Sequence, residues 1–143
     1  MKPVFIIADN IVSPLGDTTA ANLDQLLSNV PGVQLHAAGD MSDTAFYASL
    51  FPPGKYSSNS TYTKFEQLLI ASISDALQQV SINCSGSRTG LILSSTKGNI
   101  SLLETAAPGN ALNERISLQH SAQLIAKHFQ FSTKPVVVSN ACI

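Results

Sequence analysis

The sequence predicts an α/β fold in which helices flank a mainly parallel sheet. Three short runs, over residues 4–8, 89–94 and 136–138, are dominated by aliphatic, often β-branched side chains, which is typical of strands buried on both faces. Amphipathic helical segments alternate with these runs, and proline, glycine and small polar residues punctuate the connections. Parallel strands need such crossover helices, and each crossover is expected to be right-handed.

The first strand and the first helix are separated by a turn. Residues 4–8 form the expected strand, and Ser-Pro-Leu-Gly at 13–16 forms the turn. Either Asp17 or Thr18 is a suitable N-cap, because its side-chain oxygen can accept a hydrogen bond from the first helical turn. Pro-Gly at 31–32 is expected to end the helix. The apolar stripe of this helix consists of Leu23, Leu26, Leu27 and Val30.

Residues 33–61 give the weakest pattern in the chain. Glycine, proline and serine interrupt this segment, and only short apolar islands occur within it. We expect a long ordered loop with one short strand. A loop of this length in a compact domain is usually either functional or a sign of an unrecognised element.

The second helix has the clearest signals. Thr63 and Glu66 have the spacing of a capping box, in which each side chain accepts a hydrogen bond from the other residue's backbone N–H. The helix is expected to run from 63 to 80, and a polar break at 83–87 follows it. Its apolar face consists of Phe65, Leu69, Ile73, Ala76 and Val80, widened by Leu68 and Leu77.

The remaining elements complete a strand–helix–strand unit. The strand at 89–94 leads into a loop of small and polar residues at 95–99. A helix over about 113–129 follows, and the last strand, 136–138, opens after Lys-Pro at 134–135. The apolar side of this third helix consists of Leu118, Ala122, Ile125 and Phe129.

Composition limits the functional classes. The 143 residues fit one domain, 1–143, and 44% of them are hydrophobic. Charged residues make up only 12% of the chain, against a usual share of about 25%, so we expect a partner or further chain to cover much of the surface. The formal net charge of −1 provides no basic face for nucleic acid or for an anionic membrane surface.

Cysteine content and apolar run lengths point to a reducing, cytoplasmic setting. Cys84 and Cys142 are too few for a disulfide framework or a four-cysteine zinc site. No secretory signal is visible at the start of the chain. No apolar run approaches the roughly 20 residues of a membrane-spanning helix.

Cys142 is the candidate nucleophile. It follows the strand 136–138 across a tight turn of small residues, an arrangement that can present a side chain at the tip of a sheet near backbone N–H groups. A helix beginning there would lower the thiol pKa from about 8.5 and favour the thiolate. Position and spacing leave open the alternative that Cys142 is a small buried hydrophobic residue.

Four segments, in order, resemble the N-terminal part of a β-ketoacyl synthase, a condensing enzyme of the thiolase-like fold. They are the Ser-Pro-Leu-Gly turn after the first strand, the helix at 63–80, the Arg-Thr-Gly strand at 88–93 and the strand from 134 that ends in Asn-Ala-Cys at 142. Only residues 34–61 have no match. The chain departs from the family in having Ala-Asp-Asn at 8–10 in place of glycines and Ile143 in place of a small residue.

The resemblance implies a function for Cys142. It would accept an acyl group from an acyl carrier protein, and a malonyl thioester would then attack with loss of carbon dioxide, in a decarboxylative Claisen condensation without a cofactor or metal. The catalytic histidines of the family belong to its C-terminal half, so the 143 residues alone are expected to be inactive. The resemblance also implies a homodimer or heterodimer that pairs through the strand 136–138.

The other reactive side chains are expected to be structural. His120 should be solvent-exposed, His128 should flank the apolar stripe of the third helix, and His36 lies in the weakly patterned loop. Cys84 should be inert and partly buried. The residues 97–99 are Lys-Gly-Asn, but the pattern of a phosphate-binding loop does not surround them.

Three alternative functions stay open. Another acyltransferase of the thiolase-like fold would share the N-terminal pattern, and so would a catalytically silent subunit of a heterodimeric synthase, although such subunits tend to lack the cysteine. A non-catalytic α/β binding module is the alternative from a different class. It predicts an unreactive Cys142 and a self-contained, well-covered sheet.

Overall fold

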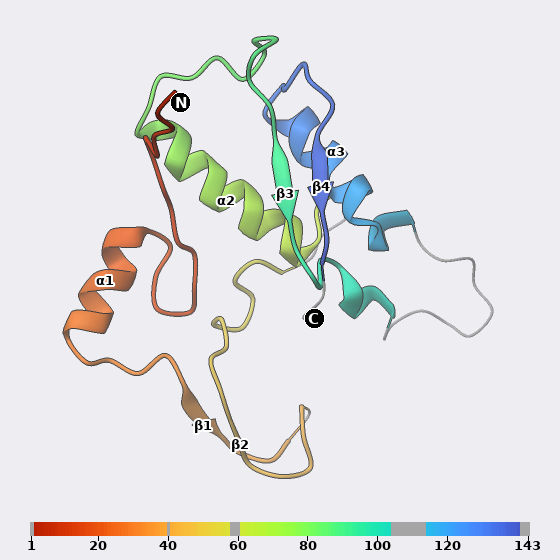
Figure 1. The fold of residues 1–143 in the computed structure, drawn as a ribbon. Helices are drawn as coiled ribbons and strands as arrows, with labels where there is room; N and C mark the ends of the chain where they lie inside the picture. Colours follow the sequence, from red (N-terminus) through yellow and green to blue (C-terminus); the bar gives the residue numbers. More distant parts are fainter. Residues whose placement is uncertain (1, 40, 58–60, 104–113, 141–143) are drawn as a thin grey trace. The chain divides into compact units, whose positions relative to one another are not determined.

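The structure, a computed structural model, describes residues 2–39, 41–57, 61–103 and 114–140 (Figure 1). These residues have mixed α/β content, with three α-helices and two small sheets. The helices are α1 (Thr19–Leu27), α2 (Lys64–Gln78) and α3 (Leu118–His128). The strands are β1 (Gln34–His36), β2 (Phe46–Ala48), β3 (Ile92–Ser94) and β4 (Val136–Val138). The chain forms two compact units, the first of residues 1–57 and 70–80 and the second of residues 58–69 and 81–143.

In the first unit, a buried asparagine ties the Ser-Pro-Leu-Gly turn to α1. The amide nitrogen of Asn22 donates to the carbonyl oxygens of Ile11 (2.9 Å), Gly16 (2.9 Å) and Thr18 (2.8 Å). The Asn22 amide oxygen accepts a hydrogen bond from the Ser13 hydroxyl. Gly16 approaches the helix so closely that an added Cβ would lie 2.7 Å from the Cβ atom of Ala21. The turn therefore needs glycine at its last position.

The start of α1 agrees with the sequence pattern, but the helix ends at Leu27, before the predicted end at 31–32, and its apolar face is not buried. Of the two candidate caps, Thr18 is the N-cap, and its side chain accepts from the Ala21 N–H (3.1 Å). The predicted apolar stripe is exposed to solvent, with Leu27 80% accessible. An amphipathic pattern buries its apolar face only when another element covers that face, and Asn22 is instead the buried residue of this helix.

The predicted buried strand at residues 4–8 is wrong for the described structure. The segment contains no strand, and Ile6 is 90% exposed. Aliphatic composition favours a strand only when a neighbouring strand takes up the backbone N–H and C=O groups. Within the described ranges, no strand pairs with these residues.

The weakly patterned segment contains a hairpin. β1 pairs with β2 in antiparallel register, with Leu35 opposite Tyr47 and His36 opposite Phe46. The ring of His36 stacks on that of Phe46, with 5.4 Å between the ring centroids. We expected one short strand here and find two, because three-residue strands are too short to produce a clear alternating pattern.

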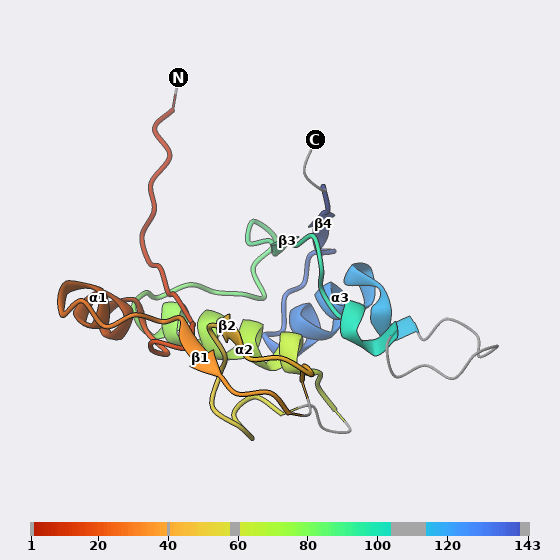
Figure 2. The ribbon, with the colours of Figure 1, turned by 90° about the horizontal axis from the view of Figure 1, so that it is seen from below.

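The second unit contains the predicted strand–helix–strand arrangement. β3 and β4 are parallel, with Leu93 opposite Val137, and α3 lies between them in the chain and contacts both. Figures 1 and 2 show the two strands side by side next to this helix. The sheet is smaller than the predicted mainly parallel sheet. Among the described residues, one pair of strands is parallel and one pair is antiparallel.

The apolar core of the second unit lies between β3 and α3. It consists of Leu93, Ala122, Ile125 and Ala126, of which Ile125 is 1% exposed. The opposite face of the strands is open: Val136 is 54% exposed, and Ile92 and Val138 are exposed as well. Side chains alternate between the two faces of a strand, so one covered face and one open face are what a helix on one side produces.

The helices α2 and α3 are both shorter than predicted. The segment expected at 113–129 contains α3 and, before it, a 3-10 turn η2 (Glu114–Ile116). A second 3-10 turn, η1 (Ile100–Leu103), follows the loop after β3. α2 begins directly after Thr63, as the capping-box pattern predicts. Of the described helices, none combines the length and the apolar character that a membrane span requires.

Candidate functional site

Cys142 lies outside the described residues, together with Ala141 and Ile143. The structure describes the strand that leads toward it. At the start of β4, the Val136 N–H donates to the Leu91 carbonyl oxygen (2.9 Å). At its end, the Ser95 N–H donates to the Val138 carbonyl oxygen (3.2 Å). Both ends of β4 are therefore hydrogen-bonded to the residues that flank β3, Leu91 and Ser95.

The carboxyl ends of β3 and β4 lie at the same edge of the parallel sheet. This edge carries small polar residues, Ser94 and Ser95 from one strand and Ser139 and Asn140 after the other. The carboxyl edge of a parallel sheet is where ligands and catalytic groups usually gather in α/β proteins. β4, the strand that leads toward Cys142, therefore ends at the edge of the sheet where binding and catalytic sites are common.

The loop after β3 is closed by its own hydrogen bonds. The Ser95 hydroxyl oxygen accepts from the backbone N–H groups of Lys97 (3.3 Å) and Gly98 (3.0 Å). Gly98 has a φ of +50°, and an added Cβ would overlap the side chain of Leu118 in α3. A phosphate-binding loop needs such N–H groups to point at the ligand, whereas these two are bonded to Ser95. The loop thus serves to join β3 tightly to α3.

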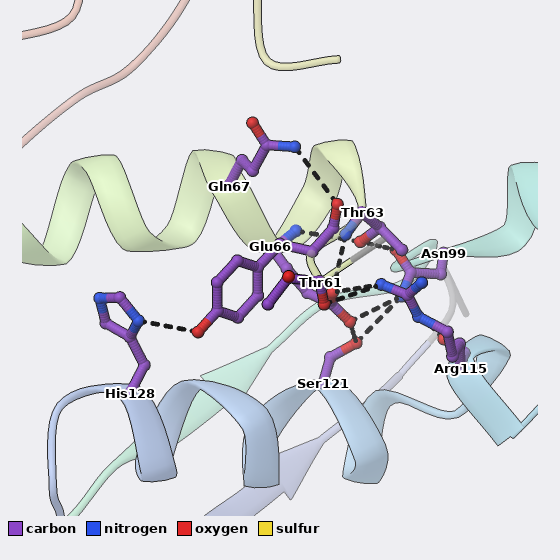
Figure 3. A network of polar contacts seen from close by, with 9 residues as sticks. Thr61, Thr63, Glu66, Gln67, Asn99, Arg115, Ser121 and His128 are labelled. Atoms are coloured by element: carbon purple, nitrogen blue, oxygen red, sulfur yellow. Dashed lines mark hydrogen bonds and ion pairs between the residues drawn. The ribbon is translucent and has the colours of Figure 1, made fainter. Parts of the chain in front are cut away.

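A buried carboxylate, Glu66, lies next to this loop (Figure 3). The Glu66 side chain is 0% exposed, and its Oε2 accepts from the Thr63 N–H (2.8 Å). In return the Glu66 N–H donates to Thr63 Oγ1 (3.2 Å). The predicted capping box is therefore present at the start of α2.

The carboxylate of Glu66 also binds three side chains from other segments. Its Oε1 accepts from the Ser121 hydroxyl (2.8 Å) and from the Asn99 amide (3.2 Å). Its Oε2 is 3.3 Å from Nη2 of Arg115, which forms a partly exposed ion pair. Figure 3 shows these side chains converging from α2, η2, α3 and the residue before η1. We call Thr63, Glu66, Asn99, Arg115 and Ser121 the Glu66 network.

Asn99 completes the network. Its amide nitrogen donates to the Arg115 carbonyl oxygen (2.7 Å) and approaches the Ser121 hydroxyl oxygen (3.0 Å). Its amide oxygen accepts from Thr63 Oγ1 (2.7 Å). Asn99, Thr63 and Ser121 are all buried. Buried polar groups that satisfy one another in this way specify a single arrangement of the segments that carry them.

The Glu66 carboxylate is held in its ionised form. Burial alone would raise its pKa, but the hydrogen bonds from the Thr63 N–H, Ser121, Asn99 and Arg115 outweigh burial and lower the pKa below its ordinary value. A carboxylate that already accepts several hydrogen bonds is a poor general base. The chemistry of the Glu66 network is therefore that of a structural anchor.

A small hollow adjoins the network. It measures about 230 Å³ and is lined by apolar side chains of Phe65, Leu68 and Leu102 and by polar ones of Thr63, Asn99 and Ser101, among others. Sites for drug-sized ligands usually measure about 300–1,000 Å³. The hollow is below that range, and two of its polar lining residues, Thr63 and Asn99, are bonded to each other.

The other candidate residues are separate from this network. His128 Nδ1 is 2.9 Å from the Tyr62 hydroxyl (Figure 3), and His36 Nε2 is 3.2 Å from the Ala48 carbonyl oxygen. His120 is half-buried, not solvent-exposed as predicted, and it lies in α3, a helix that η2 and both strands contact. Cys84 is a free, half-buried thiol. Among the described ranges, no three metal-ligating side chains come together.

The first unit has its own charged cluster. The Asp17 carboxylate accepts from Lys55 Nζ (2.7 Å) and from the Tyr56 hydroxyl (2.7 Å). Its hydrogen bonds with Lys55 and then with Tyr56 lower the pKa of Asp17. Burial and the bond to Asp17 raise the pKa of Tyr56 to about 12. The cluster joins residues 55–56 to the residue before the N-cap of α1.

Sequence reasoning identified Thr63 and Glu66 but not their partners. Ser121 occupies a polar position between apolar Leu118 and Ile125 on the buried side of α3. A small polar residue on an apolar helix face is the signal that could have revealed it. Asn99 and Arg115 give no such signal, because they lie in a loop and in a 3-10 turn.

Among known proteins, neither the family models nor the curated proteins include a match to this chain. Residue chemistry and local geometry therefore carry the functional assignment.

Proposed function

We propose that the chain is the N-terminal part of a condensing enzyme of the β-ketoacyl synthase type, with a thiolase-like fold and Cys142 as its acyl-accepting nucleophile. The observation that carries this proposal is the parallel β3–β4 pair, whose second strand ends four residues before Cys142 in the sequence. The ordered set of motifs that resembles this family supports the same assignment.

The proposed reaction has two steps. The Cys142 thiolate attacks the carbonyl carbon of an acyl thioester, so that a new C–S bond forms and the thiol of the acyl carrier protein leaves. A malonyl thioester then loses carbon dioxide, and the resulting carbanion attacks the acyl-enzyme and releases the cysteine. In the family, two histidines of the C-terminal half assist decarboxylation. We therefore propose that the 143 residues alone do not catalyse condensation.

The proposed partners follow from the same assignment. They are an acyl carrier protein, acyl and malonyl thioesters, and a second subunit, identical or related, that pairs with β4. The exposed side chains of Val136 and Val138 support a partner on this strand, because a contiguous apolar surface on a strand is unfavourable in water. The proposed cellular location is the cytoplasm.

Thiol labelling tests this proposal with an internal control. Iodoacetamide should alkylate Cys142 faster than Cys84 near neutral pH, because a nucleophilic cysteine has a larger thiolate fraction than a structural one. Peptide mapping of the unmodified chain measures both rates, and Cys142→Ser and Cys84→Ser assign the two signals. Equal or slower alkylation of Cys142 would contradict the proposal and favour a non-catalytic α/β binding module.

A further inference from the structure

We propose that Glu66 is a positioning residue for the end of β4, the strand that leads toward Cys142. The buried carboxylate holds the end of β4 through Asn99 and the loop at 95–98, a role that rests on the function proposed for Cys142. The chain of contacts lies entirely within the second unit, and each link is formed by described residues.

The first link joins Glu66 to Asn99. The Asn99 amide donates to Glu66 Oε1 (3.2 Å), and the Asn99 amide oxygen accepts from Thr63 Oγ1 (2.7 Å), which itself caps α2. Asn99 is 3% exposed, so water cannot readily replace either bond. The residue at the end of the loop is thus fixed relative to the first turn of α2.

The second link joins Asn99 to β4. Gly98, the residue before Asn99, donates its N–H to Ser95 Oγ (3.0 Å) and lies in close contact with Leu118. The Ser95 N–H donates to the carbonyl oxygen of Val138 (3.2 Å), which is the last residue of β4. The loop has little freedom to move, and a shift of Asn99 would therefore be transmitted to Ser95.

A second route reaches β4 through α3. Ser121 donates to Glu66 Oε1 (2.8 Å), and its neighbours Ala122 and Ile125 form the core against Leu93. α3 leads directly into β4 in the chain, so its position sets where β4 begins. Both routes start at the Glu66 carboxylate. The first ends at Val138, the last residue of β4, and the second ends where β4 begins.

The number of partners distinguishes this role from simple helix capping. A capping box needs only Thr63 and Glu66, yet Asn99, Ser121 and Arg115 also donate to this carboxylate from other segments. Removing its charge leaves these donors with a weaker acceptor in a buried place. We therefore expect the loop at 95–98 and the end of β4 to open more often.

The experiment compares Glu66→Gln with Asp17→Asn in the full chain. Asp17 is also a paired carboxylate, but it belongs to the first unit and to none of these contacts. The first readout is hydrogen exchange of the Ser95 amide, measured by NMR. Glu66→Gln should speed this exchange about tenfold relative to the unmodified chain, because the amide opens more often when its support weakens. Asp17→Asn should leave it unchanged.

The second readout is the ratio of the alkylation rates of Cys142 and Cys84 across neutral and alkaline pH. Glu66→Gln should lower this ratio and move the Cys142 profile to higher pH, which a merely stabilising residue would not do. Ser121→Ala removes one bond and leaves the carboxylate in place. It should change both readouts in the same direction by a smaller factor, and it carries the test if Glu66→Gln does not fold.

Distinct outcomes separate this inference from the proposed function. Unchanged Ser95 exchange and an unchanged alkylation ratio in the folded variants would overturn the positioning role. Equal acceleration of all slowly exchanging amides of the second unit would overturn it as well, because that result indicates a general loss of stability. If Cys142 of the unmodified chain reacted no faster than Cys84, the proposed function would fail, whereas accelerated Ser95 exchange would still show the coupling of Glu66 to β4.

Discussion

The two units are organised around different kinds of buried side chain. In the first unit, Asn22 is the buried residue around which the turn at 13–16 and α1 assemble. The second unit also has a buried polar centre, the Glu66 network, but it adds an apolar core around Ile125. Polar hydrogen bonds specify geometry, whereas apolar burial supplies most of the stability. The second unit should therefore be the more stable of the two.

The largest expected effect comes from the apolar core. Ile125→Ala should lower the free energy of unfolding by about 2–5 kcal/mol, because it removes a fully buried side chain and leaves a cavity. The matched change in the first unit, Ile6→Ala, should alter it by less than about 0.5 kcal/mol, since that side chain is exposed. Urea denaturation followed by circular dichroism measures both. Similar losses of unfolding free energy in the two variants would contradict the greater stability expected of the second unit.

Glu66→Gln should have the next largest effect, and this effect should depend on pH. The variant should lose about 1–3 kcal/mol of unfolding free energy at neutral pH, because buried donors lose a charged acceptor. The folded-state pKa is lowered, so the contribution of Glu66 is complete above its ordinary value of 4.5 and is lost as the pH falls through the lowered value.

Urea midpoints of the unmodified chain and of Glu66→Gln, measured from neutral to acidic pH, check this prediction. The two curves should approach each other as the pH falls. If the difference between the two urea midpoints grew as the pH fell, the carboxylate would be destabilising the fold. Glu114→Gln, a change at an exposed residue in η2, is the control and should leave the midpoints unchanged.

Asn22→Ala tests the polar centre of the first unit. It removes the hydrogen bonds that the Asn22 side chain makes with the carbonyl groups of Ile11 and Gly16 and with the Ser13 hydroxyl. We expect a loss of about 1–2 kcal/mol, with faster hydrogen exchange at the Gly16 amide. Gln25→Ala, in the same helix, should be close to neutral. An undisturbed Gly16 amide in Asn22→Ala would show that Asn22 does not organise this turn.

The smallest stability effect is expected at Asp17, although its spectroscopic effect should be clear. The Lys55–Asp17 pair is partly exposed, so Asp17→Asn should change the unfolding free energy by at most about 1 kcal/mol. The pKa of Tyr56, about 12, should fall, because the bond to Asp17 helps to raise it. The contribution of Tyr56 to the unfolding free energy is complete below pH 10.0, the ordinary pKa of tyrosine. It is lost as the pH rises through about 12.

An ultraviolet titration of the tyrosines measures this shift, and Tyr56→Phe identifies the component that belongs to Tyr56. If Asp17→Asn left that component unchanged, the hydrogen bond between Asp17 and Tyr56 would not be formed in solution. The cluster would then be reduced to the ion pair between Lys55 and Asp17.

Local signals predicted the second unit better than the first. The capping box of Thr63 and Glu66 and the strand at 136–138 are encoded within a few neighbouring residues, and both are present. Whether residues 4–8 or the apolar stripe of α1 are buried depends instead on which other segments pack against them. The local sequence pattern carries no information about those segments. The partners of Glu66 lie 33, 49 and 55 residues away in the chain, beyond the reach of any periodicity.

Gly98 has a consequence for how this sequence can diverge. Its backbone lies in the left-handed region, and the space where a side chain would begin belongs to Leu118. A homologue with alanine at this position would have to relax the loop and also carry a smaller residue at 118. Two coordinated replacements are far rarer than one, so glycine at 98 and a bulky residue at 118 should be inherited together in sequences that keep this loop.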